Sequence, residues 1–335
     1  MNVFNLRSVY FEIGSLCNLR CVHCYNNSGK PTHRFDDKQV KKLFDEISKI
    51  GCNKVIISGG EPLLHNNIID ILNFGKSTYG FEIGLVTNGT LIDNNLAKKL
   101  SRTVDYVQVS IDGTSPEEND VVRGNGTFHK AMTATKLLTE NNIKVTVNFV
   151  VTGNNTNYLY TFLSDLKRNN VFAVTFKEVI NIGRAKEGIS TTSNLIKDIA
   201  DELLPIMEEM QDENFNITPP YVSNSKCPLY FEEGYTPDIE IRISFTGEVF
   251  LCQKFETEKI FSLGNIRDDS LISILQSQRY RDLFNLIDVS TKFIKKCEGC
   301  LFTDMCFREC PATIISNKIF DYEDPLCELR QFGTF

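Results

Sequence analysis

Cys17-Asn-Leu-Arg-Cys21-Val-His-Cys24-Tyr25 places three thiols on one short loop, directly after an apolar run. At this C-x3-C-x2-C spacing the thiols can converge on one face of a cubane iron-sulfur cluster and leave the fourth iron without a cysteine. The alternative is a structural zinc site that His23 or a remote residue completes, because three thiolates and a histidine are a common zinc set. The rest of the sequence decides between these two interpretations.

The length of 335 residues and a hydrophobic content of 41% predict one large α/β domain with a smaller appendage. A net charge of -7 with four histidines argues against a nucleic-acid-binding protein. The N-terminus lacks a signal peptide and no apolar run is long enough to span a bilayer, so we expect a cytoplasmic protein without a membrane partner. In that reducing compartment, the eleven cysteines point to metal binding rather than to disulfides.

Six short β-branched runs alternate with helical segments in the first two-thirds of the chain. We expect strands at 9–13, 55–58, 81–87, 106–111, 144–151 and 171–176. We expect helices at 36–50, 66–79, 92–101, 128–142 and 157–169. Repeated β-then-α units predict parallel strands with right-handed crossovers. Six units cannot close an eight-stranded barrel, so the predicted fold is α/β, an open partial (β/α)6 TIM-like barrel with its site at the C-terminal strand ends.

The loops at those strand ends are polar or rich in glycine. Ser58-Gly-Gly-Glu-Pro62 follows the second strand, Thr87-Asn-Gly89 the third, and Ser110-Ile-Asp-Gly113 ends the fourth. Taken singly, each reads as an ordinary turn or helix cap. Their common position at one rim of the barrel predicts a ligand site, where glycine lets the backbone approach a ligand closely.

With the cysteine loop, these loops resemble the radical S-adenosylmethionine (SAM) superfamily over roughly residues 5–190. The resemblance implies that SAM binds the open iron of a cluster on Cys17, Cys21 and Cys24. It also implies a set of cofactor-binding residues. These are Gly59, Gly60, Glu61 and Pro62 for the SAM amino group, Ser110 and Asp112 for the ribose, Arg123 for the carboxylate, and Asn88 at the same rim. Gly183-Arg184-Ala185 looks like the family's adenine-side loop.

Seven further cysteines lie in the last third of the chain, where the core pattern is C-x2-C-x5-C-x3-C followed by Pro311. They are Cys227, Cys252, Cys297, Cys300, Cys306, Cys310 and Cys327. The pattern is similar to that of bacterial ferredoxins and suggests two clusters. A pair of zinc knuckles is the alternative that spacing leaves open. Upstream, residues 241–252 predict a β-hairpin with its turn at Thr246-Gly247.

This region resembles the SPASM extension of peptide-modifying radical SAM enzymes. The resemblance implies three domains: a radical SAM core at 1–190, a helical connecting segment at 191–226 and a SPASM domain at 227–335. It also implies three 4Fe-4S clusters, one that binds SAM and two auxiliary ones. Cys227, Cys252 and Cys310 would hold the inner auxiliary cluster, and Cys297, Cys300, Cys306 and Cys327 the outer one. The nineteen residues between Cys227 and Gly247 exceed the family's usual spacing.

The resemblance implies an enzyme that cleaves SAM to a 5′-deoxyadenosyl radical and oxidatively modifies a ribosomally synthesised peptide, by a cross-link, a thioether or a related C–H functionalisation. Two alternatives are a haem, quinone-cofactor or sulfatase-type maturase and a non-catalytic metal-binding regulatory protein. The expected partners are a precursor peptide and an electron donor such as flavodoxin or ferredoxin. Only 16 residues precede Cys17, so a separate leader-binding protein is a further expected partner.

The sequence identifies no acid–base residue. Tyr25, His23, Asn88 and Lys177 are polar and lie near the predicted rim, and nothing in the pattern distinguishes one of them as catalytic.

Overall fold

A computed structural model describes residues 5–180, 182–187, 193–220, 238–252, 255 and 261–292. Its strands are β1 (Asn5–Glu12), β2 (Lys54–Ser58), β3 (Glu82–Thr87), β4 (Tyr106–Ser110), β5 (Lys144–Val150), β6 (Ala173–Lys177), β7 (Asn216–Thr218), β8 (Asp238–Ile243), β9 (Glu248–Phe250) and β10 (Gly264–Asn265). Its α-helices are α1 (Asp37–Ile50), α2 (Ile68–Tyr79), α3 (Asn94–Leu100), α4 (Pro116–Arg123), α5 (Thr127–Glu140), α6 (Leu159–Arg168), α7 (Ser193–Met210), α8 (Leu271–Leu275) and α9 (Gln278–Lys292). Two 3₁₀ turns are η1 (Pro62–Leu64) and η2 (Gly183–Glu187).

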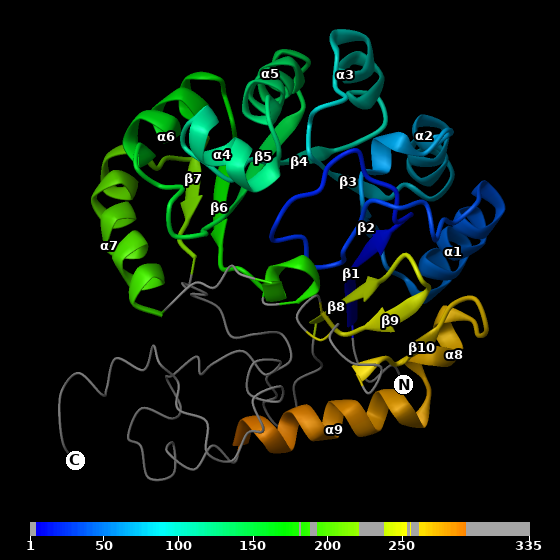
Figure 1. Ribbon diagram of the computed structural model, residues 1–335. Helices are drawn as coiled ribbons and strands as arrows, with labels where there is room; N and C mark the ends of the chain where they lie inside the picture. The colour runs from blue at the N-terminus through cyan, green and yellow to red at the C-terminus, as the bar shows by residue number, and fades with distance from the viewer. Residues whose placement is uncertain are drawn as a thin grey trace, which may run out of the picture.

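The strands form one sheet in the order β10-β9-β8-β1-β2-β3-β4-β5-β6-β7. β1 to β7 are parallel to one another, which confirms the predicted α/β partial barrel. Figure 1 shows the strands in a curved arrangement, with α1, α2, α3, α5, α6 and α7 on the outside and α4 across the front. All six predicted strands and all five predicted helices are present, with ends shifted by a few residues.

The predicted hairpin is also present as β8 and β9, which pair antiparallel. β8 pairs in parallel with β1, so this segment extends the sheet of the barrel. At the other edge, α7 leads into β7, which pairs with β6. The sequence predicts domain boundaries at 190 and 227, yet strands before, between and after these positions belong to one sheet. The boundaries remain a prediction.

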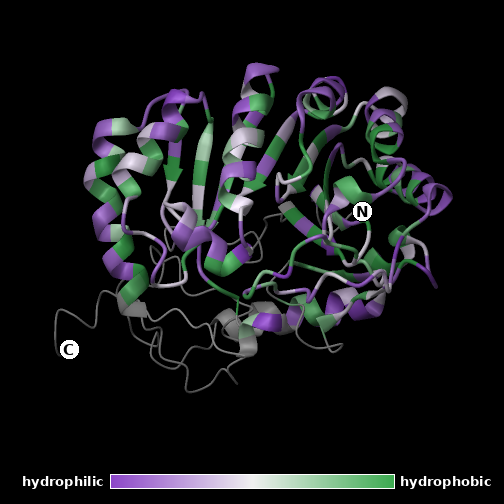
Figure 2. Ribbon diagram, turned by 45° about the horizontal axis from the view of Figure 1, so that its top comes forward, coloured by the Kyte–Doolittle hydropathy of each residue, from purple (hydrophilic) through white to green (hydrophobic). Residues whose placement is uncertain are grey.

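The two faces of the sheet differ in polarity. On β8, Ile239, Ile241 and Ile243 are fully buried and face the helices, while the charged residues between them, Glu240 and Arg242, face the barrel interior. The same alternation on β4 and β5 buries Val107, Val109, Val145 and Val147 against the helices and turns Gln108, Ser110, Asn148 and Val150 toward the interior. Figure 2 shows this as alternating purple and green along the strands. The hydrophobic core therefore lies between sheet and helices, and the interior of the barrel is polar.

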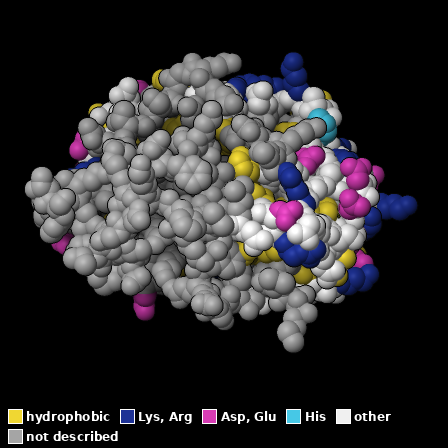
Figure 3. Space-filling model, turned by 90° about the horizontal axis from the view of Figure 1, so that it is seen from below, with side chains coloured by type: hydrophobic (Ala, Val, Ile, Leu, Met, Phe, Trp, Pro, Cys, Tyr) yellow, Lys and Arg dark blue, Asp and Glu magenta, His cyan; other side chains and the backbone are white. Residues whose placement is uncertain are grey.

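Cys52 belongs to that core, as expected of a small buried hydrophobic residue. On the face shown in Figure 3, the coloured side chains mix both signs of charge with scattered apolar groups. No described helix is long and apolar enough to cross a bilayer.

Candidate active site

The cysteine loop leaves the C-terminal end of β1 and is fastened to the barrel by backbone hydrogen bonds. Ile13 N–H donates to Ser58 O at 3.0 Å, and Val22 N–H donates to Val122 O at 3.0 Å. Cys17, Cys21 and Cys24 are each half-buried on this loop. The three thiols therefore lie at the rim where the sequence predicts the site.

Arg184 and Gly183 on η2 hold the loop from its other side. Arg184 Nε donates to Cys21 O at 2.8 Å, and its Nη1 donates to Ser28 O at 2.8 Å. Gly183 has a φ of +60°, and a Cβ at that position would lie 2.4 Å from Cys24 O. The glycine is required for this close approach. The Gly-Arg-Ala motif was noticed in the sequence, but its contacts with the cysteine loop were not predicted.

Gly59 and Gly60 continue the β1–β2 pairing into the loop. Gly60 N–H donates to Gly14 O at 2.8 Å, and Glu61 N–H donates to Leu16 O at 2.8 Å. A Cβ on Gly60 would lie 2.3 Å from Leu16 O. The Gly-Gly pair is therefore needed for the backbone of this loop to lie against the residues that lead to Cys17.

Glu61 is buried at the end of β2 with both carboxylate oxygens engaged. Thr87 Oγ1 donates to Oε1 at 2.8 Å, and Asn88 N–H donates to Oε2 at 2.8 Å. Burial raises the pKa of Glu61 to about 7, against the opposing effect of these hydrogen bonds. Pro62 then begins η1, where its missing N–H leaves no backbone donor unpaired. Asn88 is buried nearby and donates through Nδ2 to Asn18 Oδ1 at 2.9 Å.

Asp112 is fully buried beyond the end of β4 and gathers residues from three elements. Its Oδ1 accepts from Val150 N at 2.7 Å, while Oδ2 accepts from His23 Nε2 at 2.5 Å and forms an ion pair with Arg123 Nε at 2.6 Å. Burial opposes the charged form, but Arg123 and His23 lower the pKa of Asp112 to about 2. Arg123 Nη1 donates to Cys21 Sγ at 3.9 Å.

These contacts position Asp112 as an anchor for Arg123 and His23. Ser110, half-buried at the end of β4, lines the cavity described below. The assigned contacts of Ser110, Asp112 and Arg123 with SAM remain predictions. Sequence analysis missed α4, which supplies Arg123, because its polar residues following Ser115 read as a loop.

A second buried network joins the cysteine loop to β8. Arg242 donates through Nε and Nη2 to Glu12 Oε1 at 3.0 and 2.9 Å, and Tyr25 OH donates to the same oxygen at 2.8 Å. The Arg242 guanidinium also lies over the Tyr25 ring at 5.2 Å. Sequence analysis missed both Glu12 and Arg242, since neither belongs to a motif.

The donor set at the loop fits an iron-sulfur cluster better than a zinc ion. His23, the fourth ligand that the zinc interpretation needs, donates to Asp112 instead. In the part of the chain that the structure describes, no three His, Cys, Asp or Glu side chains gather closely enough to hold one metal ion. Burial raises the pKa values of Cys17, to about 11, and of Cys21, so a bound metal centre would be needed to keep these thiolates charged.

Comparisons with known proteins agree with this geometry. The family model "Radical SAM superfamily" matches residues 11–165, which include the cysteine loop, Glu61, Asp112 and Arg123. A second model, SPASM, described as an iron-sulfur cluster-binding domain, matches residues 235–301. Residues 11–165 belong to the radical SAM superfamily. It is an enzyme, and the alternative of a non-catalytic regulatory protein falls away.

Two relatives of this radical SAM enzyme show how broad its family is. Fe-coproporphyrin III synthase of Methanosarcina barkeri is 25% identical over 96% of this chain and 88% of its own length. The antilisterial bacteriocin subtilosin biosynthesis protein AlbA of Bacillus subtilis is 28% identical over 88% of this chain. The match covers 65% of AlbA, so the chain spans slightly less than two-thirds of that relative.

A crystal structure of Streptococcus suis SuiB bound to its precursor peptide SuiA has the same fold. Its TM-score is 0.76 over 97% of this chain and 76% of SuiB, with 17% sequence identity. At that identity the likeness supports the fold alone.

The SPASM match includes Cys252, Cys297 and Cys300. Cys252 lies two residues beyond the end of β9 and packs half-buried against the core, so the paired strand ends just before it instead of carrying it. The other six predicted auxiliary ligands lie outside the described residues. They are Cys227, Cys297, Cys300, Cys306, Cys310 and Cys327.

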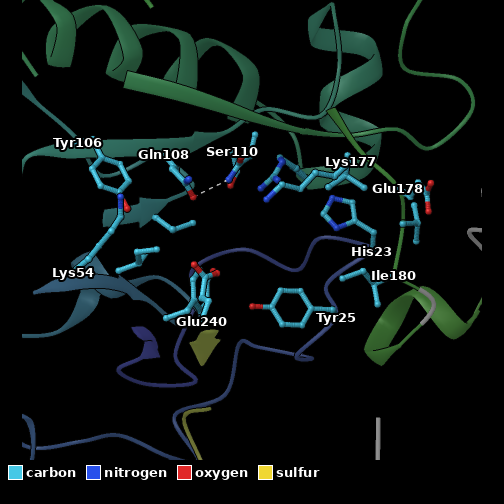
Figure 4. A pocket seen from close by; sticks show the side chains of 17 residues that line it. His23, Tyr25, Lys54, Tyr106, Gln108, Ser110, Lys177, Glu178, Ile180 and Glu240 are labelled. Atoms are coloured by element: carbon cyan, nitrogen blue, oxygen red, sulfur yellow. Dashed lines mark hydrogen bonds between the residues drawn. The ribbon is translucent and has the colours of Figure 1, made fainter. Parts of the chain in front are cut away.

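A cavity of about 450 Å³, lined by both polar and apolar side chains, lies inside the radical SAM barrel. Side chains from β1 to β6 and from β8 line it, together with His23 and Tyr25 of the cysteine loop and Arg123 of α4. Figure 4 shows His23, Tyr25 and Glu240 around this space. A substrate in the cavity would therefore lie directly beneath the cysteine loop.

Proposed function

We propose that this enzyme uses SAM and a 4Fe-4S cluster on Cys17, Cys21 and Cys24 to oxidise a ribosomally synthesised peptide within the barrel. The observation that carries the proposal is that His23 and Tyr25, which flank Cys24 on the cysteine loop, line the barrel cavity together with Ser110 and Arg123, two of the predicted SAM contacts. When bound, the cluster and SAM supply the reductive cleavage that gives methionine and the 5′-deoxyadenosyl radical.

The protein's own residues position and enclose these groups. Glu61 is a buried carboxylate at the rim, and an ammonium group placed against it would favour its charged form. Arg123, anchored by Asp112, offers a guanidinium to a carboxylate. Arg184 and the Gly59-Gly60 pair fix the loop that carries the thiols, so that its geometry is set before ligands bind.

We extend the proposal to two auxiliary 4Fe-4S clusters in the SPASM region, on Cys227, Cys252 and Cys310 and on Cys297, Cys300, Cys306 and Cys327. Such clusters would accept the electron that an oxidised substrate gives up, and a flavodoxin or ferredoxin would supply the electron for SAM cleavage. The similarity to AlbA and the fold shared with SuiB, whose structure contains a precursor peptide, support a peptide substrate. A separate leader-binding protein completes the proposed partners.

The similarity to Fe-coproporphyrin III synthase over 96% of the chain favours a second candidate, an enzyme that acts on a tetrapyrrole.

The experiment that separates the two candidates is anaerobic incubation of the reconstituted enzyme with SAM and dithionite, with either a peptide encoded beside its gene or Fe-coproporphyrin III. Release of 5′-deoxyadenosine with loss of a hydrogen pair from the peptide supports the first candidate. A changed porphyrin with an unchanged peptide supports the second. A Cys17/Cys21/Cys24→Ala variant should release no 5′-deoxyadenosine with either substrate.

A further inference from the structure

Two charged side chains face the barrel cavity without an ion-pair partner among the described residues. They are Lys177, the last residue of β6, and Glu240 on β8. Other cavity charges are paired: Lys54 Nζ lies 2.8 Å from Glu82, and Arg123 lies 2.6 Å from Asp112. Glu240 accepts a hydrogen bond from the hydroxyl of Ser8.

The two unpaired charges lie at different depths. In the sheet register Glu240 is opposite Ser8 in the middle of β1, at the level where β2 begins with Lys54. Lys177 is opposite Val150 at the C-terminal ends of β5 and β6, on the side of the cysteine loop. Lys177 therefore lies at the rim of the cavity, next to Glu178 in the sequence, and Glu240 lies near its floor, level with Lys54. Figure 4 shows both labelled side chains around the cavity.

These groups interact across the cavity. Desolvation lowers the pKa of Lys177, and the carboxylate of Glu240 partly offsets this. Both side chains are accessible from the cavity, because they face its open space. A ligand of opposite charge that enters the cavity would therefore reach either group.

We propose that the cavity recognises a basic side chain of the substrate peptide, with Glu240 as the specificity-determining residue. This inference rests on the proposed peptide-modifying function. A lysine or arginine inserted from the rim would bring its cationic end to Glu240 and leave its backbone carbonyls, which are hydrogen-bond acceptors, near Lys177. Ile56, Val86 and the ring of Tyr10 provide apolar walls for the methylene groups between them.

The test measures binding of synthetic peptides Ac-Gly-Gly-X-Gly-Gly-NH2 to the SAM-loaded holoenzyme without reductant, by isothermal titration calorimetry. X is lysine, arginine, norleucine or glutamate. We expect the basic peptides to bind about tenfold more tightly than the norleucine peptide, since norleucine has no cation to pair with Glu240. Glu240→Gln should abolish this preference, and Glu240→Lys should transfer it to the glutamate peptide.

Glu213→Gln, a change at an exposed glutamate outside the cavity, is the matched control and should keep the preference. Circular dichroism and thermal unfolding establish whether each variant is folded. If Glu240→Lys does not fold, Glu240→Gln alone provides the test. Wild-type enzyme that binds basic peptides no more tightly than norleucine, or binds none measurably, overturns the proposal. So does a Glu240→Gln variant that retains the preference.

Binding is measured without turnover, so this test and that of the proposed function fail separately. A basic preference without peptide oxidation removes the proposed reaction and keeps the recognition. Oxidation of a peptide without that preference removes the role of Glu240 and keeps the reaction.

Discussion

Arg242 on β8 donates two hydrogen bonds to one carboxylate oxygen of Glu12 on β1, and both side chains are fully buried. The same oxygen accepts from Tyr25, which directly follows Cys24. A residue from the C-terminal hairpin thus takes part in fixing the loop that would hold the SAM cluster. Because the pair is shielded from water, each partner depends on the other for charge compensation.

Arg242→Met should lower the free energy of unfolding by about 3–5 kcal/mol, because it leaves the Glu12 carboxylate buried without its cation. Urea unfolding followed by circular dichroism measures the change. Arg281→Met, at an exposed arginine on α9, is the control and should change stability little. Combining Arg242→Met with Glu12→Gln should cost less than the sum of the two single changes. Additive effects would show that the pair is not coupled.

Gly60→Ala should destabilise the cysteine loop, since the new Cβ would lie 2.3 Å from the backbone oxygen of Leu16. The expected result is a lower iron content after anaerobic reconstitution and a reduced melting temperature. Gly14→Ala is the matched control on the facing segment after β1, where the nearest atom would be at an ordinary contact distance of 3.4 Å. Equal iron contents in the two variants would contradict the role given to the Gly-Gly pair.

Because of Glu61, the free energy of unfolding in the absence of SAM should fall as pH rises from about 4.5 to about 7. Its pKa is about 7 in the folded protein and 4.5 as the ordinary value, so within this window the folded state binds the proton more tightly than the unfolded state. Deprotonation of the buried group over this range costs roughly 3 kcal/mol. Above about pH 7, Glu61 should add no further pH dependence to the free energy of unfolding.

The measurement is the urea midpoint between pH 5 and pH 8 for wild type and for Glu61→Gln. In Glu61→Gln the urea midpoint should fall less with rising pH than in the wild type, whatever the absolute stability of the variant. Glu117→Gln, at an exposed glutamate on α4, should follow the wild type. Parallel curves for wild type and Glu61→Gln would refute the raised pKa.

Iron and sulfide analysis with Mössbauer spectra tests the proposed clusters. We expect about twelve irons per chain after anaerobic reconstitution, and about four fewer in the Cys17/Cys21/Cys24→Ala variant. Stoichiometric zinc that survives in this variant would replace the auxiliary clusters and remove the proposed electron acceptor.

Much of the barrel could be predicted because its strands and helices carry local signals. Val40, Leu43, Phe44 and Ile47 lie at helical spacing and are all buried on α1, and Asp36 caps this helix with Gln39 as expected. The cysteine loop and the Gly-Gly-Glu-Pro loop could be brought together because parallel strands end at a common rim.

The long-range polar contacts could not be predicted in this way. Glu12 and Arg242 are 230 positions apart, and each stands in an alternating strand where a charged residue would ordinarily face water. Only the closure of β8 onto β1 turns that polar face into the barrel interior. For the same reason Lys177, one of four undistinguished polar residues in the sequence, acquires its significance from Glu240 across the cavity.

The pairing of β8 with β1 also determines when the barrel can be completed during protein synthesis. A growing chain leaves the ribosome from its N-terminus, so β1 is available long before the strand that covers its free edge. Until residue 243 has emerged, that edge remains open to pairing with another chain, and Glu12 has no Arg242. Completion of the site at the first strand thus waits for the hairpin, which favours cluster insertion after synthesis of the barrel rather than during it.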